Sequence, residues 1–240
     1  NYIMLNRLFV VFGLLVFWTS CSNNSAINYQ DQENYYLPVD QLKHSDLLME
    51  YRYSETGDAP FYWLYNLDIS DETAVLLQGQ QLDVYGEILA ETKELLVENG
   101  VVLKAQSIIE RDTQQLEWVK TEFDILSDDL FLFGDWDTSS KVSSKISFAS
   151  KIYKGQKTTI SKDRQFLGDT TIVFQDKSYA AKQISVNEWY DIEEVGHLEF
   201  GVQGIEVYAL GLGLVYVRKF TESGQRIEYY LHKCEIVDNE

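Results

Sequence analysis

Beginning at Tyr35, short runs rich in Tyr, Val, Ile, Phe, Trp and Thr are separated by polar turn-forming residues, and only Pro38 and Pro60 interrupt them. Runs of this kind are typical of β-strands. Turn signals at 175–178 and 193–196 add short strands to the pattern. The signals between the other runs predict four hairpins, which pair 47–54 with 61–69, 87–98 with 101–109, 166–167 with 170–174, and 214–220 with 225–236.

Regularly spaced strands, with no helices alternating between them, indicate a mainly β protein. We expect an antiparallel sheet that forms an open barrel, a half-barrel, a wrapped sheet or a sandwich, with room for one or two short helices. Residues 35–240 would form this single antiparallel β domain. Gly211 and Gly213 would lie on one face of a strand and allow that strand to coil tightly.

Residues 82–98 fit two different structures. Leu82, Tyr85, Leu89 and Leu96 recur at helical spacing, and the Asn-Gly pair at 99–100 suits the end of a helix. The same pair is also the strongest two-residue hairpin signal. Gly86 would cost a helix about 1 kcal/mol, so we favour a strand here.

The N-terminal region carries a short apolar segment that ends in a cysteine. Arg7 precedes the nearly continuous apolar run 8–18, and two small residues lead into Cys21. This run suits a signal-peptide core of roughly 7–15 residues and is shorter than the ~20 that span a bilayer. It resembles the lipobox of bacterial lipoproteins, which implies that residues 1–20 are removed and that Cys21 is lipidated. The alternative is a secretory signal with an accidental cysteine.

Residues 22–34 are polar and read as a flexible tether, with a reach of roughly 20 Å by random-coil scaling. Acyl chains on Cys21 would make the membrane a partner through the lipid anchor. Because Ser22 rather than Asp follows Cys21, the lipoprotein resemblance implies the outer membrane. The tether lacks the early acidic run that many surface-exported lipoproteins carry, so the same resemblance implies a domain that faces the periplasm rather than the cell surface.

A second resemblance involves both ends of the β region. Residues 208–216 (YALGLGLVY), the strand 227–236 (IEYYLHKCEI) and residues 35–53 (YYLPVDQLKHSDLLMEYRY) are similar to segments of cell-envelope lipoproteins from Bacteroidota. This resemblance implies an open antiparallel β-barrel or wrapped sheet, loosely like the lipoprotein-carrier fold. It implies no enzymatic activity.

The formal net charge of −18 argues against nucleic acid as a partner, because nucleic acids are bound through clustered Lys and Arg. One stretch, residues 141–164, is basic instead. If these lysines lie along an edge strand, they would protect that edge from pairing with another chain. The alternative is a docking patch for an acidic partner or for anionic headgroups. The basic residues concerned are Lys141, Lys145, Lys151, Lys154, Lys157, Lys162 and Arg164.

The sequence contains no recognisable catalytic or metal-binding motif. His197 and Glu199 would share a strand face, but zinc needs three or four ligands. Asp128, Asp129, Asp135 and Asp137 form an acidic cluster that lacks the order of a calcium loop. If Cys21 is lipidated, Cys234 has no disulfide partner, and a reactive thiol near His232 is a weak alternative to a buried one. We therefore expect no enzyme, no metal and no cofactor.

Aromatic side chains are the remaining candidates for function. Trp63 and Tyr65 would share a strand face, and Trp189 and Tyr190 lie between two acidic residues. Such rings suit an apolar ligand or a sugar, although core packing is their commonest role. Our leading hypothesis is a non-enzymatic lipoprotein that binds an apolar ligand, such as a lipid, or an envelope protein partner on a concave β surface. A glycan-binding lipoprotein and an envelope hydrolase are the alternatives.

Overall fold

The computed structural model describes residues 35–39, 41–55, 58–71, 74–112, 117–133, 137–194 and 196–238. The predicted signal segment, Cys21 and the tether lie outside these residues. One turn of 3-10 helix, η2 (Gln41–Lys43), precedes the strands. The strands are β1 (Ser45–Tyr53), β2 (Phe61–Asp71), β3 (Ala74–Leu82), β4 (Ile88–Val97), β5 (Gly100–Asp112), β6 (Glu117–Glu122), β7 (Asp124–Leu132), β8 (Lys141–Ala149), β9 (Lys157–Phe174), β10 (Lys177–Glu193), β11 (His197–Ala209), β12 (Gly213–Thr221) and β13 (Arg226–Asp238). Among the described residues, no helix is long and apolar enough to cross a membrane.

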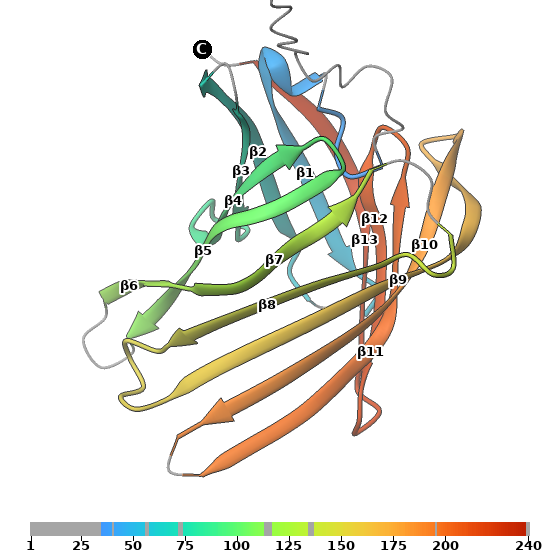
Figure 1. Cartoon of the computed structure of the whole chain (residues 1–240). Coiled ribbons are helices and arrows are strands. Elements are labelled where there is room, and N and C mark those ends of the chain that lie inside the picture. The colour runs from blue at the N-terminus through green and yellow to red at the C-terminus, as the bar shows by residue number, and fades with distance from the viewer. Residues whose placement is uncertain are drawn as a thin grey trace, which may run out of the picture.

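All strands belong to one antiparallel sheet in the order β4-β3-β2-β1-β13-β12-β11-β10-β9-β8-β7-β5-β6. Because β4 also pairs with β5, twelve strands close into a barrel, and β6 pairs with β5 outside this ring (Figure 1). The predicted mainly β, antiparallel, barrel-like fold is confirmed. The sheet goes beyond the expected open barrel, half-barrel or wrapped sheet, because closure gives every strand of the ring two neighbours.

The barrel closes at the start of β5. As the Asn-Gly signal predicts, β4 and β5 form a hairpin, in which Val97 pairs with Gly100. On the opposite side of the same strand, Gly100 pairs with Leu132 of β7. A Cβ atom on Gly100 would lie 2.1 Å from the carbonyl oxygen of Phe131, so glycine is what permits this close approach of two backbones.

The strand interpretation of residues 82–98 is confirmed, and the helical alternative is wrong. Ile88–Val97 pairs along its length with β3 and β5. The preceding residues form a turn, in which the Asp83 carboxylate accepts hydrogen bonds from the backbone N–H groups of Tyr85 (2.8 Å) and Glu87 (2.9 Å). Gly86 adopts a φ of +81°, which suits this turn and not a helix.

Two of the predicted glycine features are wrong. β9 continues through Gly168, where the register against β10 shifts between Gln183 and Ile184, so this signal marks a bulge rather than a turn. Gly211 does not lie in a strand, because it belongs to the turn between β11 and β12. Gly211 in the turn and Gly213 at the first position of β12 have φ values of +75° and +81°, which suit a reversal of the chain rather than a coiled strand face.

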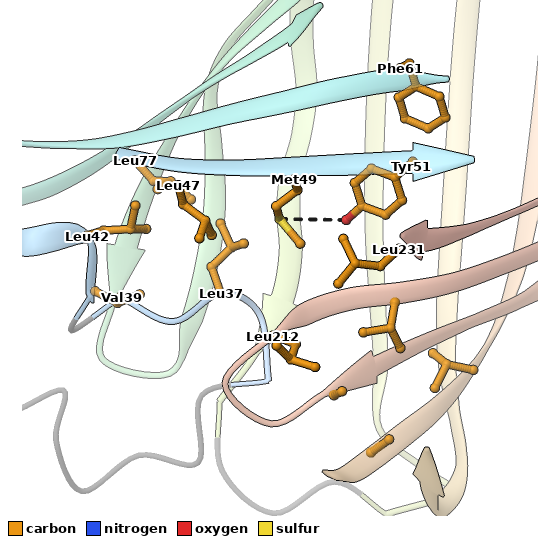
Figure 2. Packing of buried hydrophobic residues seen from close by; sticks show 14 of the residues in the cluster. Leu37, Val39, Leu42, Leu47, Met49, Tyr51, Phe61, Leu77, Leu212 and Leu231 are labelled. Atoms are coloured by element: carbon orange, nitrogen blue, oxygen red, sulfur yellow. Dashed lines mark hydrogen bonds between the residues drawn. The ribbon is translucent and has the colours of Figure 1, made fainter. Parts of the chain in front are cut away.

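The segment from Leu37 to η2 packs into the main hydrophobic core. Leu37, Val39 and Leu42 are buried there beside Leu47 of β1 and Leu212 of the β11–β12 turn (Figure 2). A Cβ atom on Gly213 would lie 2.5 Å from the carbonyl oxygen of Tyr36. The absence of a side chain at Gly213 therefore leaves space for this segment against the sheet.

The basic stretch does not mark a sheet edge. β8 pairs with β7 and β9, and β9 pairs with β8 and β10, so the prediction of edge protection is wrong. Strand alternation and the β8–β9 connection, which contains Lys151 and Lys154, divide the stretch instead. Lys162 and Arg164 face the barrel interior, whereas the other five lysines are exposed.

Candidate functional site

A cavity of about 340 Å³ lies inside the barrel and is lined by residues from the N-terminal segment and from most strands of the ring. One part of its wall is aromatic. Trp63 and Tyr65 stack with a centroid distance of 5.5 Å and an angle of 12° between their planes. Both rings lie over Gly79, where a Cβ atom would be 2.8 Å from the Tyr65 ring and 3.2 Å from the Trp63 ring. Glycine at this position of β3 thus makes room for the two rings.

A charged cluster forms another part of the wall, centred on Glu206 of β11. The Glu206 side chain is 2% exposed and accepts hydrogen bonds from three groups. These donors are Lys162 Nζ at 2.6 Å, Arg164 Nε at 2.9 Å and the Tyr208 hydroxyl at 2.9 Å. Alternation along β9 places Lys162 and Arg164 on the same inward face, two residues apart.

Glu188 of β10 extends this cluster toward β12. Its Oε1 atom lies 2.7 Å from Lys219 Nζ and 3.1 Å from Lys162 Nζ, and its Oε2 atom accepts a hydrogen bond from the Tyr190 hydroxyl at 3.2 Å. Lys162 therefore bridges the two carboxylates. With 19% of its side chain exposed, Lys162 is also the most solvent-accessible member of the cluster.

Both carboxylates are held ionised by these cations. Burial raises the pKa of Glu188, but Lys162 and Lys219 overcome this effect and lower the pKa to about 2. Burial likewise opposes ionisation of Glu206, whose pKa is nevertheless lowered well below its ordinary value by Lys162, Arg164 and Lys219. The cluster is thus ionic at neutral pH.

Glu94 of β4 behaves in the opposite way. It is buried in the cavity wall, where its Oε2 atom accepts a hydrogen bond from the Tyr36 hydroxyl at 2.9 Å. Burial raises the pKa of Glu94 to about 7, although the Tyr36 hydrogen bond and the charge of Arg164 partly offset that rise. Glu94 is therefore the carboxylate of this cavity wall that changes its protonation near neutral pH.

Arg164 has a buried donor that is not used. Its Nη1 atom is shielded from solvent and has no hydrogen-bond partner among the described residues. Leaving such a donor unpaired in a folded protein costs roughly 1–3 kcal/mol. An unsatisfied guanidinium N–H in the wall of a cavity is what a site for an acceptor group would provide.

The structure brings together three of the four predicted ligand-binding residues. Trp63, Tyr65 and Tyr190 all line the cavity, whereas Trp189 lies on the outer surface and is 47% exposed. The Trp189 ring covers Gly201 of the neighbouring strand, where a Cβ atom would lie 2.7 Å from the ring. Strand alternation points these two adjacent side chains to opposite faces of β10. Tyr190 therefore faces the cavity, where contact with a ligand stays a prediction, and Trp189 does not face the cavity.

The charged residues of the cavity were not among the predicted site residues. Lys162 and Arg164 lie in the basic stretch, and their spacing of two within an otherwise strand-like run was the available signal. The structure shows that Lys162 and Arg164 share their inward face with the apolar residues Ile160 and Phe166, which identifies this face as the interior one. Nothing in the local sequence distinguishes Glu206 or Glu188 from the many other acidic residues.

The candidate metal ligands meet at the surface, near the β10–β11 hairpin. His197 Nε2 lies 2.9 Å from Glu199, and His197 Nδ1 lies 3.4 Å from Asp191. The three potential ligand atoms are all within 4.8 Å of one another. The Glu199 hydrogen bond and the Asp191 charge raise the pKa of His197, which favours an ion-paired imidazolium rather than the neutral ring that binds metals.

The acidic cluster and Cys234 have contacts that suit a structural role. Asp137 accepts hydrogen bonds from Ser139 and organises a turn, and Asp128 forms an ion pair with Lys104. Asp135 lies outside the described residues. Burial raises the pKa of the Cys234 thiol to about 11, which is opposite to what a reactive thiol needs.

A second hollow, of about 500 Å³, lies along β3 to β6 and is lined mainly by amide and charged side chains. Its carboxylate Glu91 accepts hydrogen bonds from Lys120 and Gln80, so these polar groups already satisfy one another. The barrel interior, with its aromatic wall and its unpaired donor, is the better candidate site.

No protein-family model and no curated protein sequence matches this chain. Two crystal structures share its fold. One is a protein of Parabacteroides distasonis, provisionally assigned as a lipoprotein, with a TM-score of 0.56, 11% identity, and coverage of 86% of this chain and 100% of that one. The other is a provisionally assigned exported protein of Bacteroides fragilis with a YmcC-like fold, with a TM-score of 0.53, 12% identity, and coverage of 80% of this chain and 96% of that one. The described chain therefore has the same β-barrel architecture as these two proteins.

Proposed function

We propose that this chain is a non-enzymatic lipoprotein of the cell envelope whose barrel interior binds an apolar ligand. The observation that carries the proposal is the cavity itself, because the side chains of this barrel leave space in its interior. Its volume of about 340 Å³ falls within the range of ligand pockets, roughly 300–1,000 Å³. The stacked Trp63 and Tyr65 rings supply a flat apolar surface for the ligand.

The proposed location in the cell envelope rests on other observations. Cys21 follows a segment that resembles a lipoprotein signal, and the two proteins that share the fold are provisionally assigned as a lipoprotein and an exported protein. Lipidation of Cys21 would hold the barrel beside the membrane, within reach of the tether. The outer membrane, with the barrel on its periplasmic side, is the location that this proposal adopts.

The cavity proposal is tested with a neutral apolar fluorophore, N-phenyl-1-naphthylamine, added to the full chain made with Cys21→Ser so that no anchor lipid is attached. We expect saturable enhancement of its fluorescence. Ser144→Phe, which places a ring in the cavity, should abolish the enhancement. Ser143→Phe is the matched control, because Ser143 is the exposed neighbour on the same strand.

Equal fluorescence enhancement by the two serine variants would show that the probe binds elsewhere and would remove the proposal. An envelope protein partner or a glycan would then be the ligand to test. Cys21→Ala should release the chain from the membrane fraction, and a variant that stays in that fraction would overturn the anchor.

A further inference from the structure

The charged cluster inside the barrel has an uneven balance. Three cations, Lys162, Arg164 and Lys219, face two ionised carboxylates, so one positive charge has no fixed counter-charge within the cluster. A buried charge is costly unless it is paired and hydrogen-bonded. Such an arrangement favours a negatively charged group from outside the protein.

The unpaired charge coincides with an unused donor. Arg164 lines the cavity, about nine-tenths of its side chain is buried, and Nη1 has no hydrogen-bond partner in the part of the chain that the structure describes. Its other bonding nitrogen, Nε, is already held by Glu206 at 2.9 Å. The guanidinium is therefore held in position by Glu206, while the N–H groups of Nη1 have no acceptor among the described residues.

The aromatic wall and the charged cluster line the same cavity. Trp63 and Tyr65 face it from β2, while Lys162 and Arg164 face it from β9. A molecule in this space would contact flat apolar rings at one part and cations at another. That combination matches an amphiphile rather than a wholly apolar ligand or a sugar.

We propose that the cavity binds a singly charged anionic amphiphile, with its carboxylate on Arg164 and Lys162 and its hydrocarbon chain against Trp63 and Tyr65. This inference rests on the proposed function, because it names the ligand class of the same cavity. A long-chain fatty acid has the required chemistry. A dianionic phosphate monoester would exceed the single positive charge that the cluster leaves unpaired.

Glu94 makes this recognition dependent on pH. Glu94 lines the same cavity as the cluster and accepts a hydrogen bond from the Tyr36 hydroxyl. The charged side chains that face this cavity with it are Lys162, Arg164, Glu188 and Glu206, and Tyr65 also interacts with Glu94. When Glu94 is protonated, the excess positive charge is available to the ligand. When Glu94 ionises, it supplies the missing negative charge itself, and fatty-acid binding weakens. Because burial raises the pKa of Glu94 to about 7, affinity should fall between pH 6 and pH 8.

The experiment compares dodecanoic acid, 1-dodecanol and dodecyl phosphate by isothermal titration calorimetry on the full chain with Cys21→Ser. We expect dodecanoic acid to bind at least about tenfold more tightly than the alcohol, which corresponds to about 1.4 kcal/mol. Dodecyl phosphate should bind more weakly than dodecanoic acid. Glu94→Gln should remove the dependence of the dodecanoic acid affinity on pH.

Two variants test the role of the cluster. Arg164→Lys keeps the charge but removes Nη1, and we expect it to lose most of the preference for the acid over the alcohol. Lys145→Met is the matched control, because Lys145 is an exposed lysine on the outer face of β8. This control should retain the full preference.

The outcomes separate this inference from the proposed function. Equal affinities for dodecanoic acid and 1-dodecanol would overturn the anionic ligand while leaving an apolar site. Binding of neither compound would overturn both. If Arg164→Met/Glu206→Met folds and keeps the preference, the ligand carboxylate does not bind Arg164, and the inference is overturned.

Discussion

Two clusters of ion pairs in this molecule use similar residues and have different consequences. Inside the barrel, Glu206 and Arg164 are almost completely buried. At the β10–β11 hairpin, His197 and Glu199 are about half exposed. Water and salt screen the outer cluster, so it contributes little to stability. The inner cluster is desolvated, and each partner therefore depends strongly on the other. The environment, more than the residue types, decides what an ion pair does.

The largest effect should follow Arg164→Met, which leaves Glu206 buried with one fewer cation. Removing one partner of a buried pair costs about 3–5 kcal/mol, and we expect a loss of unfolding free energy near the lower end because Lys162 remains. Urea denaturation measures this change. Arg164→Met/Glu206→Met should recover most of it, and a double variant as unstable as the single one would show that the side-chain packing of Arg164 matters more than its charge.

A second effect concerns Glu94, whose pKa is raised from 4.5 to about 7 in the folded chain. Between these values the folded state holds a proton that the unfolded state releases, so stability falls as pH rises from about 4.5 to 7 and is level above. The largest loss expected is about 3.4 kcal/mol. Glu94→Gln should flatten this part of a urea-midpoint profile, and an unchanged slope would assign the pH dependence to other groups.

A smaller effect is expected for Tyr190→Phe, which removes the hydrogen bond to Glu188. Loss of one hydrogen bond to a charged, partly buried acceptor costs about 1–2 kcal/mol. The adjacent Trp189→Phe is the outer-face comparison. If chemical denaturation shows Trp189→Phe to be the more destabilising of the two, packing over Gly201 outweighs the interior hydrogen bond.

The smallest effect should follow His197→Ala. This cluster is exposed, and we expect no measurable change in the urea midpoint. Addition of Zn²⁺ should leave the thermal midpoint of the wild-type chain unchanged. A zinc-dependent increase that His197→Ala abolishes would contradict the ion-pair interpretation and establish a metal site.

Much of the fold could be predicted from local patterns. The β1–β2 and β12–β13 hairpins lie close to the predicted runs, and the turn signal at 175–178 corresponds to the β9–β10 turn. In that turn, Gln175 and Asp176 both have positive φ, as a type I′ turn requires. These features depend on residues that are neighbours in sequence, so the sequence carries their signal directly.

The errors have a common physical origin. Gly168 and Gly211 are compatible with a bulge, a turn or a coiled strand, and only the pairing register decides among these. The basic stretch suggested an edge because lysines protect exposed strand edges, but lysines also lie on the outer face of a strand that is paired on both sides. Whether β8 and β9 have neighbours on both sides depends on strands far away in the sequence.

By itself, the amino-acid sequence determined a strand-rich antiparallel domain, most of its turns and the alternation that puts Lys162 and Arg164 on one face. Tertiary structure alone decided that the sheet closes, because closure requires pairing between β5, β4 and β7. It also decided that Lys162, Arg164, Lys219, Glu188 and Glu206 meet, since they come from four strands. The contribution of a charge to the free energy of folding depends on the groups and the solvent around it, and these are fixed only when the barrel has formed.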